Sequence, residues 1–441
     1  MNTDSIMTEI STLGEAKIPT PVQKKSDGTE DISFVSDLSR VIIEVDGSRI
    51  SQMLKKSQPL PSFELAGPRK HIFFDPSKLK CALVTCGGLC PGLNDIIRSI
   101  VLELHYGYGV RNIFGIRYGL QGFIASYGHN LIDLTCEFVV NIHDRGGTVL
   151  GSSRGPQDND DIVDSLERMN IGLLFMIGGD GTLTAASRIT DKIADRGLKI
   201  GVVGVPKTID NDIYMVSRSF GFDTAVDVAT SAIVSASNEA EGYPNGIGLL
   251  KLMGRHSGFI AATAVLAQQD VNFLLIPEVD FDLGGSNGLL NALEKRLTER
   301  KHAVIVVAEG AGQKFFENGT KEQDASGNIK LKDIGIYLKE AIITYFAGKG
   351  IDISIKYIDP SYMIRSLPAN ANDRVFCNFL GRNSVHAGMC GKTGILIGHW
   401  NNQFVHVPMK LIAEKRKKVN PKGSLWRSAL EATGQSSLKN E

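Results

Sequence analysis

Short, continuously apolar segments recur along the chain from about residue 79, and several of them end in glycine. They read "LKCALVTCGG", "GLLFMIGGDG", "LKIGVVGVP", "GIGLLKLMGR", "VNFLLIPE", "HAVIVVAEG" and "IDISIKYIDP". A strand with one face in water alternates apolar and polar residues, whereas a parallel strand covered on both faces is apolar throughout. The pattern therefore predicts buried parallel strands.

Amphipathic segments separate these apolar runs. They include "DIVDSLERMN", "TLTAASRITDKIADRG" and "DTAVDVATSAIVSASNEAE", in which apolar residues recur at helical spacing. Strands that alternate with helices indicate an α/β fold with open, largely parallel sheets. A chain of 441 residues is longer than one core of ordinary size requires. We therefore predict two Rossmann-like α/β domains.

Several segments lie outside this alternation. Residues 1–76 are mixed in character, and "PTPVQKKSDGTED" and "KKSQPLPSFELAGPRK" within them resemble linkers. We expect an N-terminal extension that lies on the surface or wraps another subunit. The stretch "GQKFFENGTKEQDASGNIKLKDIG" predicts a surface loop. The basic run "EKRKKVNPKG" has two interpretations, a solvated helix end or a contact with a phosphate or regulatory anion.

Composition excludes some classes of function. The chain has 48 Lys and Arg residues and 48 Asp and Glu residues, so no net charge attracts nucleic acid or an anionic membrane. Its six cysteines lack the spacing of a disulfide scaffold or zinc site, and we expect six thiols. No segment approaches the ~20 apolar residues of a membrane span, and the N-terminus lacks the apolar run of a signal peptide. We expect a cytoplasmic protein.

The sequence contains three glycine-rich turns. In "IGGDGT" (177–182), glycines would let the backbone approach a phosphate, and the following helix would offer free N–H groups. Asp180 could reach a magnesium ion on that phosphate, although such a turn can also be a simple connection. "TCGGLCPGLN" contains Gly88, and "GGTVLGSSRG" brings Arg154, a residue type suited to phosphate oxygens. Three such turns at strand ends favour a phosphate-binding site.

The stretch "VPKTIDND" (205–212) places many polar groups directly after an apolar run. Such groups need partners, so they either cap the next element or converge on a ligand. Phosphoryl transfer to an alcohol requires a base, a metal-bound carboxylate and positive charge near the transferred group. In this stretch, the two aspartates are suited to the base and the metal-bound carboxylate, and the lysine is suited to the positive charge.

The order "GGDGT", "PKTIDND", "MGRHSGF" and "VVAEG" resembles the 6-phosphofructokinase family, from about Leu79 to about His406. NAD and lipid kinases share only the glycine turn. The segment "FELAGPRKHIFFDP" and the chain length resemble the longer subgroup, which lies near the pyrophosphate-dependent enzymes but includes ATP users. The resemblance implies that ATP phosphorylates the 1-hydroxyl of fructose 6-phosphate, a step of glycolysis.

The resemblance also implies site residues. Asp210 would be the general base, Arg255 would stabilise the transferred phosphoryl group, and Thr208 would assist catalysis. The cofactors would be Mg²⁺, held by Asp180, and ATP as co-substrate, bound by Gly88, Arg154, Gly179, Asp180, Gly181, Thr182 and Lys207. Fructose 6-phosphate would contact Thr208, Asp210, Asp212, Met253, Gly254, Arg255, Glu309, Tyr362 and Arg365.

Two positions bear on the phosphoryl donor. Lys207 resembles the pyrophosphate-using enzymes, whereas Gly181 resembles the ATP users, in which the nucleotide needs a position without a side chain. An aspartate at that position would add bulk and charge beside the α-phosphate, so Gly181 favours ATP. The alternative is the same reaction with pyrophosphate. A catalytically idle nucleotide-binding regulator is a further alternative, but Asp210 and Asp180 are both present.

Residues that depart from the shorter bacterial enzymes limit what the resemblance implies. They are Leu89, Arg117, Gly155 and Gly246, so we carry over no allosteric effector. We expect a nucleotide-binding domain of residues 77–221 with 366–411 and a sugar-phosphate-binding domain of residues 222–365. Residues 412–441 would form a C-terminal segment. The partners would be the two small-molecule substrates and further copies of the chain, with a tetramer favoured over a dimer.

Overall fold

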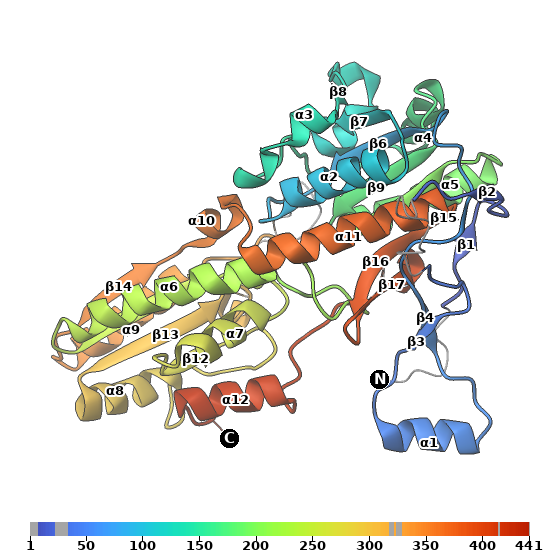
Figure 1. The fold of residues 1–441 in the computed structure, drawn as a ribbon. Coiled ribbons are helices and arrows are strands. Elements are labelled where there is room, and N and C mark those ends of the chain that lie inside the picture. The colour runs from blue at the N-terminus through green and yellow to red at the C-terminus, as the bar shows by residue number, and fades with distance from the viewer. Residues whose placement is uncertain (1–7, 23–33, 317–321, 323–328, 413–414, 441) are drawn as a thin grey trace. The chain divides into compact units, whose positions relative to one another are not determined.

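The computed structural model describes residues 8–22, 34–316, 322, 329–412 and 415–440. The chain divides into two compact units. Unit 1 comprises Met1–Thr208, Ile213–Gly221 and Ser366–Arg416, and unit 2 comprises Ile209–Asp212, Phe222–Arg365 and Lys417–Glu441. Each unit has its own sheet with helices on both faces (Figure 1). The predicted fold of two Rossmann-like α/β domains is confirmed.

The main sheet of unit 1 has, within the described residues, nine strands in the order β3-β4-β17-β16-β10-β9-β6-β7-β8. The neighbours β16-β10-β9-β6-β7 run parallel, and the pairs outside them are antiparallel. The strands are β3 Arg40–Ile42, β4 Ser62–Leu65, β6 Lys80–Thr85, β7 Asn112–Ile116, β8 Ile132–Asp133, β9 Leu173–Gly178, β10 Gly201–Pro206, β16 Ile395–Trp400 and β17 Gln403–Pro408.

Helices cover both faces of this sheet because its central strands are apolar on both sides. In β9, Leu174 and Met176 lie in one core with α4 and α5, whereas Leu173 contacts α11 at Gly388. Figure 1 shows α2 and α11 side by side, in agreement with their extensive contact. The helices are α2 Leu93–Leu102, α4 Asn159–Arg168, α5 Asp180–Asp195 and α11 Ala371–Met389, with α1 Gly47–Lys55 in the extension and α3 Cys136–Val139 beside α2.

Unit 2 contains a wholly parallel sheet, with the order β12-β13-β11-β14 within the described residues. One face packs against α8 and α9 through a continuous apolar core, and the other packs against α6 and α7. The elements are β11 Gly246–Leu252, β12 Phe273–Leu275, β13 His302–Ala308, β14 Ser354–Ile358, α6 Phe222–Glu241, α7 Phe259–Gln268, α8 Leu289–Arg300, α9 Ile334–Gly348, α10 Ser361–Ser366 and α12 Ser424–Thr433.

Most sequence-based expectations for these elements are confirmed. Each of the seven apolar runs contains a strand, and the three amphipathic segments form α4, α5 and α6. All six cysteines lie in the described part of the chain, and each is a thiol. Within the described ranges, no helix combines the length and apolarity that crossing a bilayer requires. Much of the predicted surface loop 312–335 lies outside the described residues.

The linker interpretation of residues 55–70 is wrong for Ser62–Leu65, because this segment forms β4 and pairs with β17. Phe63 is fully buried in an apolar cluster, which accounts for the strand. Glu64 points into a polar interior, where Arg69 donates to it at 3.0 Å and Lys392 lies 3.1 Å away. His406 of β17 contacts the same carboxylate at 3.0 Å. A buried ionic cluster therefore joins the extension to the sheet.

The surroundings of Glu64 favour its ionised form. Burial opposes the charge, but the contacts with His406 and Lys392 outweigh it and lower the pKa of Glu64 to about 2. A carboxyl group with a depressed pKa stabilises the fold above its unfolded pKa, and this stabilisation is lost as the pH falls through the folded value. The cluster should therefore hold the extension in place at neutral pH.

We predict that Lys392→Met destabilises the protein by roughly 3 kcal/mol, because it removes one partner of a buried carboxylate. Lys410→Met is the matched control, since Lys410 pairs with Asp191 at an exposed site and should contribute less than about 1 kcal/mol. Chemical denaturation of both variants measures the difference. Equal effects of the two substitutions would contradict the importance of the buried cluster.

Candidate active site

The glycine loops of unit 1 lie at the carboxyl ends of three neighbouring parallel strands. Gly88 follows β6, Gly179 follows β9, and Lys207 follows β10. Lys207 Nζ donates to the carbonyl oxygen of Gly88 at 2.7 Å, and its own carbonyl oxygen lies 3.3 Å from where a Cβ on Gly179 would stand. Arg154 approaches the Cβ position of Gly88 to 3.8 Å. The structure thus brings together four of the residues that the sequence predicted.

The first turn of α5 contains Asp180, Gly181 and Thr182. The N–H groups of a first helical turn have no partner within the helix, and the helix dipole makes this end electropositive. A Cβ on Gly181 would meet no atom within 4 Å, so this position is open. The Asp180 carboxylate lies 3.2 Å from the guanidinium of Arg416. The turn is therefore suited to an anion such as a phosphate.

Unit 2 has a second cluster of predicted residues, at the carboxyl ends of β11, β13 and β14. Met253, Gly254 and Arg255 follow β11, Glu309 follows β13, and α10 after β14 contains Arg365. The two loops after β11 and β13 are joined, since Glu309 donates its N–H to Leu252 at 2.9 Å and Gly310 donates to Gly254 at 3.2 Å.

Glycine is required at two positions of these loops. Gly254 has a φ of 131°, which residues with a side chain rarely adopt. A Cβ on Gly310 would stand 2.1 Å from the carbonyl oxygen of Arg255. The close approach of the two backbones therefore fixes where the side chains of Arg255 and Glu309 begin.

The segment Ile209–Asp212 belongs to unit 2, although the residues on both sides of it belong to unit 1. The fully buried Ser257 donates its hydroxyl to the carbonyl oxygen of Asp210 at 3.2 Å, and the carboxylate of Asp210 accepts the backbone N–H of Arg255. Thr208, the last residue of unit 1 before this segment, accepts a hydrogen bond from Ser219 at 2.6 Å.

The pKa values of Asp210 and Glu309 are both raised. Asp210 as a residue is partly accessible, but its carboxylate is enclosed. Burial, together with the neighbouring carboxylates of Asp212 and Glu309, raises the pKa of Asp210 to about 7, against the opposing charge of Arg365. Burial also raises the pKa of Glu309, which Arg365 and Arg255 oppose. A carboxyl group that titrates near neutrality is suited to accept a proton.

Two arginines and a tyrosine that were predicted for the sugar site differ in their contacts and in their exposure. Arg365 donates its Nε–H to the sulfur of Met253 at 3.1 Å. The guanidinium of Arg255 donates to the carbonyl oxygen of Ile329. Tyr362 lies on α10 with 81% of its surface exposed, outside this acidic cluster.

The sequence and the fold resemble those of known proteins. The family model described as phosphofructokinase matches residues 80–387. The chain belongs to the phosphofructokinase family. It is 49% identical to an ATP-dependent 6-phosphofructokinase from Borreliella burgdorferi, across 98% of each chain, and 46% identical to one from Amycolatopsis methanolica, across 96% of this chain and 94% of the relative.

Solved structures of this family share the fold. A pyrophosphate-dependent phosphofructokinase from Marinobacter aquaeolei has a TM-score of 0.66 at 20% identity, covering 81% of this chain and 92% of its own. The phosphofructokinase of Saccharomyces cerevisiae has a TM-score of 0.58 at 22% identity, covering 81% of this chain and 47% of its own. At these identities the likeness concerns the fold alone.

Sequence reasoning did not single out Lys251, which lies near the end of β11 in this phosphofructokinase family member. Its ammonium lies 2.6 Å from Asp333, the N-cap of α9, and 2.8 Å from Asp359. Burial opposes the charge, but both hydrogen bonds outweigh it and raise the pKa of Lys251. Asp359 accepts the N–H of Ser361 at 3.1 Å, where α10 begins. The sequence did contain a sign of this role, because Lys251 is a lysine inside the apolar run "GLLKLMG" and a charged residue there requires a partner.

The basic run also needs a correction. The solvated interpretation is wrong for Lys417, because its Nζ donates to Asn211 at 3.0 Å and burial lowers its pKa. Arg416 is exposed, as that interpretation expects, and it also pairs with Asp180. The partners, Asp180 and Asn211, lie more than 200 residues earlier in the sequence, so the basic run alone could not indicate these contacts.

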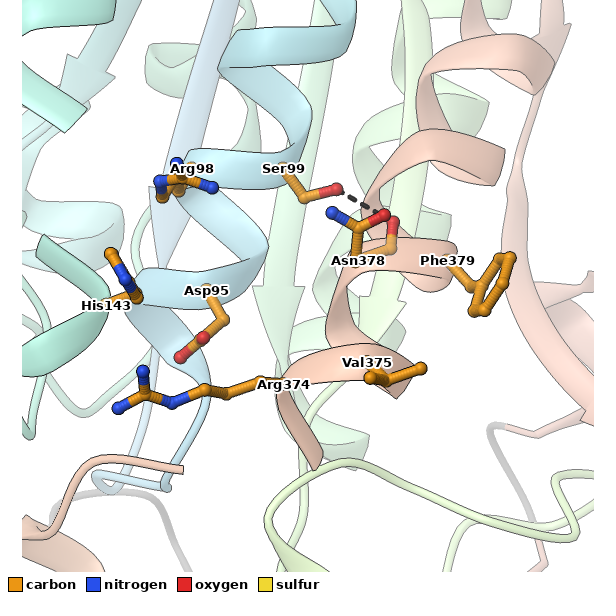
Figure 2. A pocket seen from close by; sticks show the side chains of 8 residues that line it. All are labelled: Asp95, Arg98, Ser99, His143, Arg374, Val375, Asn378 and Phe379. Atoms are coloured by element: carbon orange, nitrogen blue, oxygen red, sulfur yellow. Dashed lines mark hydrogen bonds between the residues drawn. The ribbon is translucent and has the colours of Figure 1, made fainter. Parts of the chain in front are cut away.

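A further cavity, of about 410 Å³, lies in unit 1 and is lined by none of the predicted residues. Figure 2 shows Asp95, His143 and Arg374 on one side of it and Val375 and Phe379 on the other. Its basic groups have partners in the protein, since Arg98 donates to Val140 and Arg374 donates to Asp144. We assign no function to this cavity.

We predict that Lys251→Met destabilises the protein by roughly 1.5–3 kcal/mol, because it leaves two facing aspartates without their shared cation. Lys314→Met is the control, since Lys314 also joins two aspartates of unit 2, Asp280 and Asp282, but is more exposed. Its loss should stay below about 1 kcal/mol. Thermal and chemical unfolding compare the two, and similar losses would mean that Lys251 has no special structural role.

Proposed function

We propose that this protein is an ATP-dependent 6-phosphofructokinase, which transfers the terminal phosphoryl group of ATP to the 1-hydroxyl of fructose 6-phosphate. The products are fructose 1,6-bisphosphate and ADP, and the reaction belongs to glycolysis. The observation that carries the proposal is the position of Asp210, a carboxyl group with a pKa raised to about 7 that lies beside Arg365, Glu309 and the backbone N–H of Arg255. Relatives that match 98% and 96% of the chain bear the name of this activity.

Unit 2 would bind the sugar phosphate and remove its proton. Asp210 takes the proton of the 1-hydroxyl, and its pKa near the working pH suits both accepting and releasing that proton. Arg365 neutralises the 6-phosphate with Tyr362, and Glu309 accepts hydrogen bonds from sugar hydroxyls. Arg255 stabilises the charge that develops on the transferred phosphoryl group, while Met253 and Gly254 form the wall against the sugar.

Unit 1 would bind the nucleotide. The N–H groups at the start of α5, from Asp180 to Thr182, face the phosphates, and Gly88 and Gly179 let the backbone approach them. Arg154 and Lys207 add positive charge beside these glycines. Thr208 joins this unit to the segment that contains Asp210, and Asp212 completes that segment.

The chemistry of Asp180 fits magnesium. The ion prefers hard oxygen ligands and usually binds through one or two carboxylates together with substrate phosphates. Within the described ranges no group of three or more His, Cys, Asp or Glu residues is gathered for a metal, so this chain would contribute few of the ligands. Asp180 would hold the ion, which would neutralise charge on the phosphates during transfer.

Other features of the proposal concern the cell and the assembly. We assign the protein to the cytoplasm and expect a homo-oligomer, with a tetramer favoured over a dimer, under allosteric control. Size-exclusion chromatography with light scattering tests the assembly.

The donor is tested by supplying fructose 6-phosphate with ATP or with pyrophosphate. We predict faster turnover with ATP, and a strong loss of ATP use in Gly181→Asp, because the aspartate would place a negative charge beside the α-phosphate. The open space at Gly181 means that this variant should unfold at the temperature of the unmodified protein. Faster turnover of the unmodified protein with pyrophosphate would establish the alternative, which the position of Lys207 favours.

We predict that Asp210→Asn folds but loses roughly 10²–10⁴-fold in turnover, the usual contribution of a positioned base. The raised pKa makes the unmodified protein lose stability as the pH rises from about 4 to about 7, because the folded state binds more protons than the unfolded state. The variant should therefore gain stability relative to the unmodified protein over this window.

Turnover and thermal unfolding at a series of pH values measure both effects. Asp352→Asn, at an exposed aspartate of unit 2, is the control that should change neither. Near-normal turnover of a folded Asp210→Asn variant would remove Asp210 from the role of base.

A further inference from the structure

Lys417 is the first residue of the C-terminal part of unit 2, and it contacts the segment that contains Asp210. Its backbone N–H donates to the carbonyl oxygen of Asp212 at 2.8 Å, and its ammonium donates to the side-chain oxygen of Asn211 at 3.0 Å. Lys417 thus binds two successive residues directly after Asp210.

The bonded residues are constrained and buried. Asn211 has a φ of 53°, in the left-handed region that asparagine tolerates better than most residues. Asn211 and Asp212 are both buried, so their polar groups require partners inside the protein. The contacts of Lys417 supply such partners and fix a backbone conformation that a free loop would seldom adopt.

Lys417 is itself held in place. Its ammonium lies 5.1 Å from the centre of the Phe259 ring, within the range of a cation–π contact. Burial lowers the pKa of Lys417 to about 8, and the Asp212 carboxylate opposes this shift. Two residues later, Val419 donates its N–H to Glu278 at 2.8 Å, and Glu278 also accepts the N–H of Gly258 at 3.0 Å.

The segment therefore has anchors on both sides within unit 2. Ser257 binds the carbonyl oxygen of Asp210 from the loop after β11, and Lys417 binds the following two residues from the C-terminal segment. We propose that Lys417 is a positioning residue for phosphoryl transfer, which acts through Asn211 and Asp212 to hold the Asp210 carboxylate against the loop of Arg255. This inference rests on the proposed function.

The expected consequence concerns turnover more than binding. A misplacement of about 1 Å by a distant mutation can cost about 100-fold in rate, because reacting groups must be aligned. Lys417→Met should therefore lower kcat by roughly 10- to 100-fold. The KM values for ATP and fructose 6-phosphate should change far less, because the proposal gives Lys417 a role through Asn211 and Asp212 and no contact with either substrate.

The experiment compares Lys417→Met, Asn211→Ala and the double variant, with Lys422→Met as control. Lys422 is an exposed lysine of the same C-terminal segment, and its loss should leave kcat unchanged. If Lys417 acts through Asn211, the double variant should be hardly slower than the slower single variant, because coupled residues are not additive. Circular dichroism and thermal unfolding establish that each variant is folded.

Three results would overturn the inference. They are a normal kcat in folded Lys417→Met, fully additive losses in the double variant, and a raised KM for ATP at normal kcat, which would make Lys417 a substrate contact. If Lys417→Met does not fold, the Asn211→Ala variant tests the inference by itself. It removes the side-chain oxygen that accepts the hydrogen bond of Lys417, and it should lower kcat by roughly tenfold. The unmodified protein in the same assay tests the proposed function separately, because its inactivity would reject the kinase activity itself, whereas normal activity of both the unmodified protein and Lys417→Met would reject only the role of Lys417.

Discussion

The repulsion between three carboxylates at one end of the unit 2 sheet is the constraint on which much else depends. Asp212 and Glu309 both lie close enough to act on Asp210, and burial withholds the water that would screen these charges. Two unit charges 4 Å apart interact by roughly 4 kcal/mol at an effective dielectric constant of 20. Such a group persists only if cations lie near it or a proton binds. Both conditions apply, because Arg365 opposes the raised pKa of Asp210 and that pKa is near 7.

The parallel sheet of unit 2 brings part of this group together. Glu309 follows β13, Arg255 follows β11 and Arg365 lies after β14, and these strands all end at one edge. Asp210 instead follows β10 of the unit 1 sheet, and its contacts with Ser257 and the backbone of Arg255 place it beside these residues. The glycines then set the spacing. Gly254 and Gly310 let the loops after β11 and β13 approach so closely that a side chain on Gly310 would collide with Arg255. Lys251 fixes the third loop by binding Asp333 and Asp359, before the helix that contains Arg365.

Sequence patterns predicted the parts of the structure that depend on local periodicity. Continuous apolar runs identified the seven strands because both faces of each sheet are covered. The strand Ser62–Leu65 was missed because its buried glutamate is stabilised by His406 and Lys392, more than 300 residues away. Lys417 was missed for the same reason, since its partners lie near residue 211. Glycine and acidic motifs indicated the site through residue type, whereas the residues that hold those motifs in place are specified only by the folded chain.

Lys207 and Gly181 favour different phosphoryl donors in the sequence, and their surroundings in the structure differ. Lys207 is buried and donates to the carbonyl oxygen of Gly88, so it joins two strand-end loops of unit 1 whichever donor is used. Its presence therefore does not require pyrophosphate. Gly181 differs, because its φ lies outside the left-handed region and a Cβ there would meet no atom within 4 Å. Neither the backbone nor packing demands glycine at this position. The open space beside Gly181 is therefore compatible with the proposed approach of the α-phosphate of ATP to the start of α5.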